Sequence, residues 1–322
     1  MNNRNVNINK QNIAFLFPGQ GSQEIGMGRD LFGYSKEAEY LIKEANEVLQ
    51  KENINIKELC LNGPEEELTR TENAQPAILT VSFILYKILL NEGIRPDMVA
   101  GHSLGEYSAL VSASAIGFKE AVKLVRKRGE FMQQAMMGNN GSMVAIISFY
   151  KEKIDRMIKE VSNIGIIEIA NYNSPYQIVV SGESEVLEKL IALGEREEEV
   201  SIVPLRVSAP FHSSLIRKAK KQLAEYLENV AINNPEMPVI CNFTADYINT
   251  EEEIKEALIE QMTHPIRWVE VVEKMQEDGI NIFVEVGPGN VLKKLTKQIL
   301  PKGKVYSVSD LDSLGKTVHK LS

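Results

Sequence analysis

The chain has 322 residues, of which 43% are hydrophobic and 25% charged, so a disordered chain is excluded and there is room for one large domain with an insertion or for two modest domains. Its formal net charge of −8 argues against general nucleic-acid binding, and no apolar run reaches the ~18 residues that a membrane span needs. The two cysteines, Cys60 and Cys241, lie far apart, and no cysteine–histidine cluster has the spacing of a zinc site.

The N-terminal segment is polar and rich in asparagine, and it lacks the apolar core of a signal peptide. We therefore predict a disordered extension over residues 1–12 and a cytoplasmic location for the protein.

Short apolar runs alternate with helical patterns over much of the chain. Residues Ile13–Phe17, Asp97–Ala100 and Ile282–Val286 are largely continuous apolar runs of strand length, typical of strands that are buried on both faces. Their alternation with helices predicts an α/β fold around a parallel sheet.

The middle of the chain has a different order of elements. It predicts strand, helix, strand, strand, helix and strand, which is the β-α-β-β-α-β order of the ferredoxin-like unit. We therefore expect a small domain over residues 136–206, inserted into a large α/β domain formed by residues 13–135 and 207–322. The elements expected in the small domain are strands at 142–147, 166–170, 177–180 and 200–207, and helices at 151–161 and 183–193.

A glycine–serine motif follows the second apolar run. Residues Gly101–Gly105 fit G-x-S-x-G, in which a serine lies on a sharp strand-to-helix turn and both glycines avoid a clash. Ser103 is therefore a candidate nucleophile, with an ordinary turn between a strand and a helix as the alternative.

A serine nucleophile needs a base, and the chain has four histidines. His102 adjoins the serine on a tight turn and should point away from it, while His264 follows a helix and His319 lies near the C-terminus. His212 lies on a loop between a predicted strand and a basic helix, where it could reach a site. A structural loop histidine is the better interpretation of His212 from its position alone.

The glycine-rich loop after the first strand resembles two nucleotide-binding motifs, and both can be excluded. Residues Gly19–Glu24 partly match the dinucleotide-binding motif G-x-G-x-x-G, but Glu24 occupies the position of its third glycine. A phosphate loop counted from Gly21 has Met27 where lysine is needed. A loop that donates a backbone N–H to an oxyanion remains.

One arginine is aligned with apolar residues on a predicted helix at 119–135. Ala121, Val125, Arg128 and Met132 recur at helical spacing and share one face. Arg128 could extend its charged end to water or form a structural salt bridge, or it could bind a substrate carboxylate through two hydrogen bonds.

Together these residues resemble the malonyl-CoA:acyl carrier protein transacylase family, which includes the discrete acyltransferases of polyketide synthases. The resemblance extends from about Ile13 to Leu300 and implies an α/β-hydrolase-like large domain with an inserted ferredoxin-like small domain. The motifs that carry it are Phe17–Gln23, Gln75–Ala77, Gly101–Leu110, Arg128–Gly129, Phe211–Ser213 and Glu285–Gly289.

The resemblance also implies roles for particular residues. Ser103 would take the acyl group, and His212 would take the serine proton and later activate the incoming thiol. The backbone N–H groups of Gln20 and Leu104 would form the oxyanion hole, and Arg128 would hold the free carboxylate of malonate.

Two more roles follow from the same resemblance. The backbone carbonyl of Gln261 would orient His212 in place of a triad acid. Phe211 resembles the pattern that selects malonyl over methylmalonyl groups.

The resemblance finally implies a ping-pong transfer from malonyl-CoA to the phosphopantetheine thiol of an acyl carrier protein, in fatty acid or polyketide synthesis, without a metal or bound cofactor. Carrier proteins are acidic, so the basic clusters Arg217–Lys221 and Lys293–Lys294 could form a docking rim, although solvated helix faces are the simpler interpretation. We expect no nucleic-acid or membrane partner, and a monomer, since no long exposed apolar helix is predicted.

Two other functions remain possible at this stage. A serine hydrolase or thioesterase would share the G-x-S-x-G turn and the oxyanion loop but would have no use for Arg128 on an apolar face. A non-catalytic docking module of a megasynthase would have no reason to keep Ser103, His212 and Arg128 together.

Overall fold

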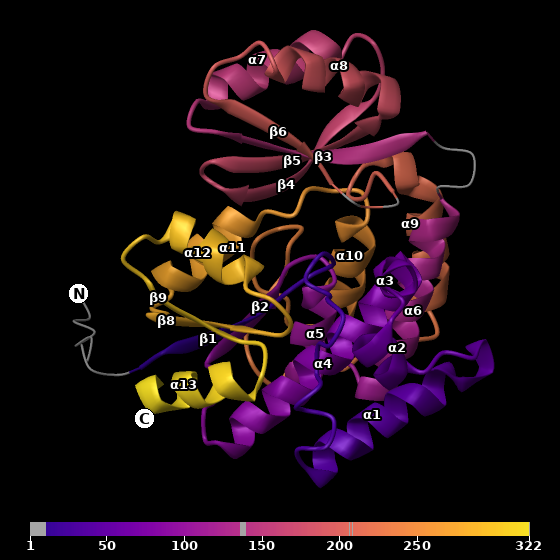
Figure 1. Ribbon diagram of the computed structural model, residues 1–322, viewed down its shortest axis with the longest axis vertical. Helices are drawn as coiled ribbons and strands as arrows, with labels where there is room; N and C mark the ends of the chain where they lie inside the picture. Colours follow the sequence, from indigo (N-terminus) through magenta and orange to yellow (C-terminus); the bar gives the residue numbers. More distant parts are fainter. Residues whose placement is uncertain (1–10, 136–139, 206, 208, 322) are drawn as a thin grey trace.

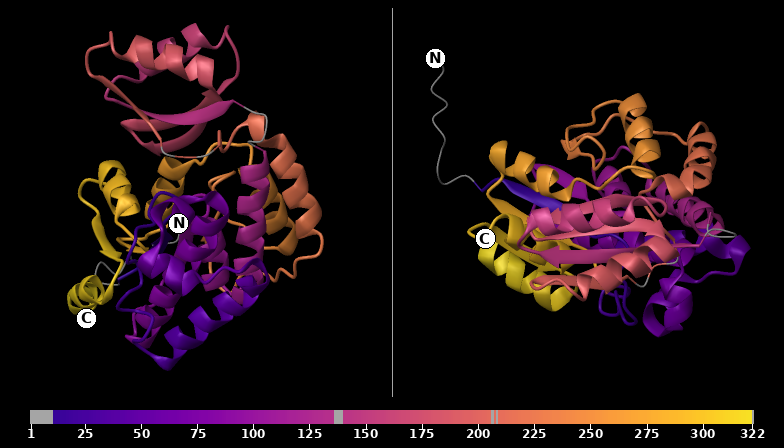
Figure 2. Two further views of the ribbon diagram at one scale, coloured as in Figure 1. Left: turned by 45° about the vertical axis from the view of Figure 1, so that its right-hand side comes forward. Right: turned by 90° about the horizontal axis from the view of Figure 1, so that it is seen from above.

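The computed structural model describes residues 11–135, 140–205, 207 and 209–321. A four-stranded sheet with two helices lies above a larger unit of helices around a five-stranded sheet (Figure 1). Two further views show the same arrangement, with the small sheet covering one end of the large unit (Figure 2).

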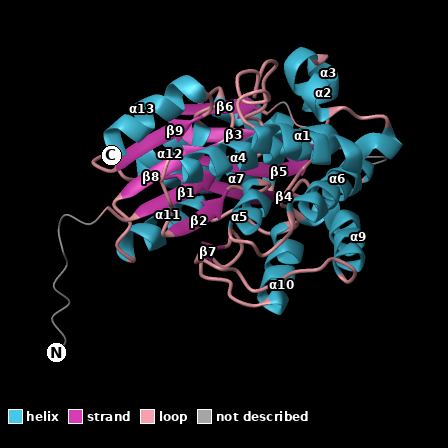
Figure 3. Cartoon of the chain, turned by 90° about the horizontal axis from the view of Figure 1, so that it is seen from below, coloured by secondary structure: helices cyan, strands magenta, loops and turns pink. Residues whose placement is uncertain are grey.

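The large sheet is parallel and has the strand order β7-β2-β1-β8-β9 (Figure 3). Its strands are β1 Ile13–Phe17, β2 Met98–Gly101, β7 Val239–Ile240, β8 Ile282–Val286 and β9 Lys304–Val308. The three strands predicted from apolar runs are all present, at or within one residue of the expected bounds.

Helices cover both faces of this sheet. In β1, Phe15 and Phe17 point into the core formed with α4 and α5, while Leu16 points into the core formed with α11 and α12. The continuous apolar run of β1 is therefore explained by burial on both faces. The helices of the large unit are α1 Lys36–Leu49, α2 Ile56–Asn62, α3 Glu65–Thr69, α4 Thr71–Asn91, α5 Gly105–Ser112, α6 Phe118–Gln134, α9 Arg217–Leu227, α10 Glu251–Gln261, α11 Trp268–Glu277, α12 Val291–Ile299 and α13 Leu311–Leu321, with short 3₁₀ helices η1 Gln50–Glu52 and η2 Ser214–Ile216.

Helix α4 is the one helix in the described ranges that is long and apolar enough to cross a membrane by length and composition. Its most apolar stretch is 83% buried inside the protein, as expected for a helix at the centre of a core.

The small sheet is antiparallel and has the order β4-β5-β3-β6, with α7 and α8 on its outer face. This order and connectivity are those of the predicted ferredoxin-like unit. The elements are β3 Gly141–Ser148, α7 Lys151–Val161, β4 Ile167–Ser174, β5 Gln177–Glu183, α8 Ser184–Gly194 and β6 Val200–Pro204.

Three predicted strand ends are wrong. Strand β5 continues to Glu183 instead of ending at residue 180, because Ser181–Glu183 still pair with Gly141–Met143 of β3. Strand β4 continues to Ser174 instead of ending at residue 170, because a bulge lets Asn171 and Tyr172 keep pairing with β5. Strand β6, an edge strand, ends at Pro204 rather than at residue 207, although the Leu205 N–H still donates to the Met143 carbonyl oxygen at 3.0 Å.

The predicted domain boundaries stay predictions. Residues 1–10 of the expected N-terminal extension, and residues 136–139 and 206 at the ends of the small domain, lie outside the described residues.

Candidate active site

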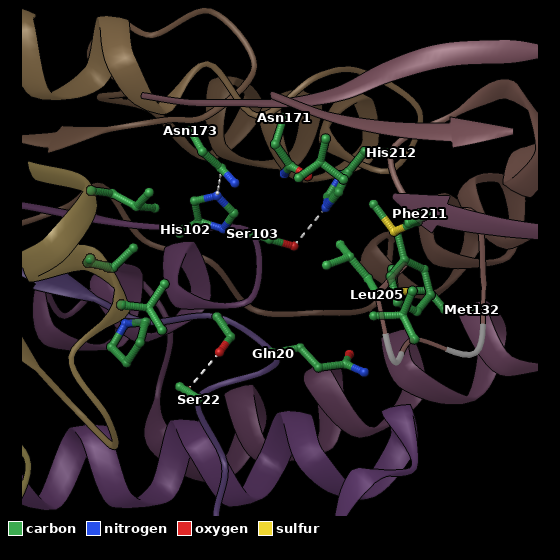
Figure 4. Close-up of a pocket in the computed structure, with 18 of the residues that line it drawn as sticks. Gln20, Ser22, His102, Ser103, Met132, Asn171, Asn173, Leu205, Phe211 and His212 are labelled. Atoms are coloured by element: carbon green, nitrogen blue, oxygen red, sulfur yellow. Dashed lines mark hydrogen bonds between the residues drawn. The ribbon is translucent and has the colours of Figure 1, made fainter. Parts of the chain in front are cut away.

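The candidate site lies where the carboxyl ends of the parallel strands meet, beneath the inner face of the small sheet. The loop after β1 carries Gln20, the turn after β2 carries Ser103, and the turn after β8 leads into α12. A cavity of about 160 Å³ is lined by these segments and by Asn171 and Asn173 of β4 (Figure 4). Loops at this edge of an α/β sheet usually bind ligands.

The turn at Ser103 has the geometry that its two glycines predict. A Cβ atom on Gly101 would lie 1.9 Å from the carbonyl carbon of Gly105, and one on Gly105 would lie 1.9 Å from the carbonyl oxygen of Phe17. Ser103 itself has φ of 51°, a left-handed conformation that is strained for a residue with a side chain. This conformation presents the hydroxyl to the cavity.

The side chains of His212 and Ser103 point toward each other in the cavity (Figure 4). Its Nε2 lies 2.9 Å from Ser103 Oγ, and its Nδ1 lies 2.7 Å from the backbone carbonyl oxygen of Gln261. A carbonyl can only accept, so Nδ1 carries the proton and Nε2 is free to accept one from the serine. The predicted roles of His212 and Gln261 are thus geometrically possible.

The environment keeps this imidazole neutral. His212 is 4% exposed, and burial lowers its pKa from 6.5 to about 3, with the positive charge of Arg128 adding to the shift. The hydrogen bond to Gln261 opposes the shift but does not reverse it. A neutral imidazole is the form that can take a proton.

The other histidines are engaged elsewhere. His102 Nε2 lies 2.9 Å from Asn173 Oδ1, and the ring packs edge-on against Trp268. His264 Nδ1 lies 2.9 Å from the backbone oxygen of Glu260, and His319 is on α13. His212 is therefore the histidine that the fold brings to Ser103.

Arg128 is 1% exposed and lies beside the nucleophile. Its Nη2 donates to Ser103 Oγ at 3.1 Å and to Gln261 Oε1 at 2.9 Å, and its Nη1 donates to Gln75 Oε1 at 3.0 Å. The predicted apolar stripe on α6 is confirmed, because Ala121, Val125 and Met132 are buried with it.

This guanidinium has neutral partners. Within the described residues Arg128 forms no ion pair, and its Nε has no hydrogen-bond partner. Burial lowers its pKa, while Tyr107 and Glu106 act in the opposite direction. The guanidinium also lies over the Tyr107 ring, 5.3 Å from its centroid, and it forms no ion pair within the described residues, so an anionic ligand would be a favourable further partner.

The expected oxyanion donors have free N–H groups. Over the described ranges the backbone amides of Gln20 and Leu104 have no hydrogen-bond acceptor, whereas the amide of Ser103 donates to Asn242 Oδ1 at 2.7 Å. The side chain of Gln20 lines the cavity and donates to Thr71 on α4 at 3.2 Å. The amide of Ser103 is thus occupied, which leaves those of Leu104 and Gln20 for a ligand.

Three polar residues around the site were not assigned roles from the sequence: Gln75, Glu106 and Asn242. Gln75 and Glu106 lie in the quoted motifs, so their place in the site could have been suspected, and Asn242 lies two residues after the end of the buried strand β7. Glu106 is fully buried, and burial raises its pKa to about 7.

The described parts of the chain contain no group of three or more histidine, cysteine, aspartate and glutamate side chains that could hold a metal ion.

Comparison with known proteins gives a consistent result. The acyl transferase domain family matches residues 14–318. The malonyl CoA-acyl carrier protein transacylase of Bacillus subtilis is 43% identical over 96% of this chain and 97% of its own length.

Solved structures agree with the sequence match. The malonyl CoA-acyl carrier protein transacylase of Clostridium perfringens has a TM-score of 0.90 at 40% identity, covering 96% of this chain and 97% of that one. A malonyl-transacylase in complex with its type II polyketide acyl carrier protein has a TM-score of 0.91 at 39% identity, covering 96% of this chain and all of that one. The chain belongs to the acyl transferase family.

Proposed function

We propose that this chain moves a malonyl group from malonyl-CoA to the phosphopantetheine thiol of an acyl carrier protein, through an ester on Ser103. The observation that carries this proposal is the contact between three groups in one cavity: a serine, a neutral histidine and a buried arginine that forms no ion pair within the described residues. Relatives named malonyl CoA-acyl carrier protein transacylase, similar over nearly the whole chain, support the same substrate and acceptor.

In the first half-reaction Ser103 Oγ attacks the carbonyl carbon of the malonyl thioester while His212 Nε2 takes the hydroxyl proton. The N–H groups of Leu104 and Gln20 donate hydrogen bonds to the carbonyl oxygen and stabilise the negative charge that develops on it. The carbon–sulfur bond then breaks, the proton moves from His212 to sulfur, and coenzyme A leaves as a thiol.

In the second half-reaction the carrier thiol gives its proton to His212 and attacks the malonyl ester. The carbon–oxygen bond to Ser103 breaks, and the serine recovers its proton from His212. The lowered pKa of His212 favours the neutral imidazole, so the transferred proton tends to leave the ring again.

Arg128 gives the reaction its preference for malonyl groups. Its Nη2 is within hydrogen-bond distance of Ser103 Oγ, so the carboxylate at the far end of a malonyl group on that oxygen could be paired by the same guanidinium. The mechanism uses no metal or bound cofactor, because each proton transfer is assigned to His212.

Two basic clusters are proposed as docking surfaces for the acidic carrier. Lys293 and Lys294 follow Val291 and Leu292, which line the cavity that contains Ser103. Arg217, Lys220 and Lys221 border a second hollow, of about 820 Å³, that reaches His212 from the other side. Complementary charge at such rims mainly accelerates encounter.

We further propose that the chain works as a cytoplasmic monomer that needs no membrane or nucleic acid. The transfer would serve fatty acid or polyketide synthesis; one relative, 42% identical over 89% of this chain, is named a polyketide biosynthesis malonyl CoA-acyl carrier protein transacylase.

Incubation with malonyl-CoA alone tests the proposal. The expected result is a malonyl adduct on the wild-type chain, seen by intact-mass spectrometry and mapped to Ser103, and no adduct on Ser103→Ala. Equal labelling of the two proteins would refute the assignment. Rapid hydrolysis of malonyl-CoA without a carrier protein would favour a thioesterase instead.

A further inference from the structure

The backbone of Ser103 is held from both sides by buried side chains. Asn242 Oδ1 accepts the Ser103 N–H at 2.7 Å, and Gln261 Nε2 donates to the Ser103 carbonyl oxygen at 3.1 Å. A left-handed residue with a side chain persists only when its surroundings fix it, since the conformation is strained. These two side chains help to fix it here, together with the backbone N–H of Glu106, which donates to the Ser103 carbonyl oxygen at 3.1 Å.

Asn242 binds the turn at two points. Its Oδ1 accepts from Ser103, and its Nδ2 donates to the carbonyl oxygen of Gly101 at 2.8 Å. One side-chain amide therefore bridges Gly101 and Ser103, at the two sides of the turn. Asn242 is fully buried and lies at the carboxyl end of β7, which pairs with β2 immediately before the turn. It reaches Ser103 from 139 positions along the chain.

Asn242 is itself fixed by a buried carboxylate. Its backbone N–H donates to Glu106 Oε2 at 2.8 Å, and the same oxygen accepts from Gln261 Nε2 at 3.0 Å. The carbonyl of Gln261 in turn holds His212. Nucleophile and base are thus joined through one hydrogen-bonded network that includes Asn242.

We propose that Asn242 is a positioning residue for Ser103: by occupying the Ser103 N–H and the Gly101 carbonyl, it holds the serine hydroxyl in line with His212 and leaves the oxyanion to the N–H groups of Leu104 and Gln20. The proposal rests on the function proposed for Ser103. It assigns Asn242 no contact with substrate.

The first test compares Asn242→Ala with Asn73→Ala. Asn73 is a matched control, because it is 6% exposed, donates to a backbone oxygen at 2.8 Å and accepts from Arg126 at 2.6 Å, but does not contact Ser103. The quantities to measure are the single-turnover rate of Ser103 malonylation, the Michaelis constant for malonyl-CoA and the melting temperature of each protein.

Asn242→Ala should acylate about 10- to 100-fold more slowly, because small misplacements of reacting groups have effects of this size. Its Michaelis constant should change little, and Asn73→Ala should acylate at the wild-type rate even if its melting temperature falls. A wild-type rate in Asn242→Ala overturns the proposal. So does an equal loss of rate in both variants that follows their loss of stability.

Asn242→Asp provides a second test if the alanine variant does not fold. A neutral carboxyl group can still accept from Ser103 and donate to Gly101, whereas the ionised form cannot donate and lies close to Glu106. The acylation rate of this variant, divided by that of wild type, should therefore rise as the pH is lowered from about 8 to about 5.5. A constant ratio overturns the proposal, while failure of wild type itself to label Ser103 would instead refute the proposed function.

Discussion

At the scale of single residues, burial sets the chemistry of His212. Its pKa is lowered from 6.5 to about 3 by burial and by Arg128, so the imidazole should stay neutral throughout the physiological range. We expect its NMR resonances to show no titration step between about pH 5 and 8. A step near the ordinary value would mean that the ring is hydrated and that the proposed base is half-charged at pH 6.5.

The lowered pKa of His212 also makes the free energy of unfolding depend on pH. Between the folded value near 3 and the unfolded value near 6.5, the unfolded chain binds a proton at His212 that the folded chain does not. Stability contributed by the neutral ring is therefore complete above pH 6.5 and falls as the pH drops through this window.

Replacement of the proposed base should be far more damaging than replacement of its nearest alternative. His212→Ala should slow acylation by about 10²–10⁴-fold, the usual effect of a general base, and His264→Ala should have little effect because that ring contacts Glu260 rather than Ser103. Single-turnover acylation of both variants measures this. The reverse order would identify the wrong histidine.

Arg128 should decide which acyl group is transferred. Loss of one partner of a buried charge pair costs about 2–5 kcal/mol, so Arg128→Ala should lose most malonyl transfer. Acetyl-CoA has no carboxylate to leave unpaired, so its use should hold steady or rise. The measurement is the malonyl-to-acetyl ratio of kcat/KM in wild type and variant, and an unchanged ratio would make Arg128 a structural residue.

Helical spacing could predict the position of Arg128, whereas Gln75 could be suspected only from its motif and Asn242 could not be predicted. Helical spacing alone puts Arg128 on the buried face of α6, and this holds in the structure. Gln75 and Asn242 reach the site from α4 and from the end of β7, and no local spacing reveals which distant element will lie beside Ser103. That information exists only once the strand order is known.

At the scale of elements, the close contact between α4 and α6 depends on Gly129. A Cβ atom at this position would lie 2.5 Å from the Cα of Glu72, so the two helix backbones would have to separate. Gly129→Ala should destabilise the protein by about 1–3 kcal/mol, as overpacking usually does. Denaturant unfolding measures the change.

Gly315 on α13 is a matched control for this substitution. It is exposed, and a Cβ atom there would have nothing within 4 Å. Gly315→Ala should therefore be neutral or stabilise by up to about 1 kcal/mol, since alanine is the better helix former. Equal effects at both positions would contradict the packing argument.

Element types were more predictable than element ends. The helices expected at residues 119–135 and 151–161 occur as Phe118–Gln134 and Lys151–Val161, because their apolar periodicity is strong. Strand β4 was predicted too short because its last residues, including Asn171 and Asn173, are polar. Those amides face the cavity rather than an apolar core, so a functional requirement obscured the strand pattern.

At the scale of the whole molecule, the order of the small-domain strands was enough to predict the inserted ferredoxin-like unit. The position of the basic clusters relative to the cavity was not predictable, because it depends on how the two sheets are arranged. Lys293 and Lys294 have no ion-pair partner within the described residues, whereas Lys220 lies 2.6 Å from Glu260 and Lys221 3.9 Å from Glu225.

These differences predict unequal contributions of the two clusters to docking. Charge reversal at Lys293 and Lys294 should raise the Michaelis constant for the carrier protein more than reversal at Lys220 and Lys221, because the first pair forms no ion pair within the described residues and directly follows Val291 and Leu292, which line the cavity with Ser103. Reversal at Lys220 and Lys221 should still raise that constant and leave malonyl-CoA acylation unchanged. Both effects should shrink with added salt, since charges at a rim are screened over about 8–10 Å.

The controls separate docking from a general effect of charge. Lys36→Glu/Lys43→Glu on α1 makes the same change in net charge on a helix at the opposite end of the molecule from the small sheet (Figure 1), and it should not alter carrier kinetics. Free pantetheine, an uncharged acceptor thiol, should be used equally well by all three double variants. An effect that is equal for pantetheine and carrier would point to damage within the cavity, and unchanged carrier kinetics at low salt in both cluster variants would move the docking surface to another face of the protein.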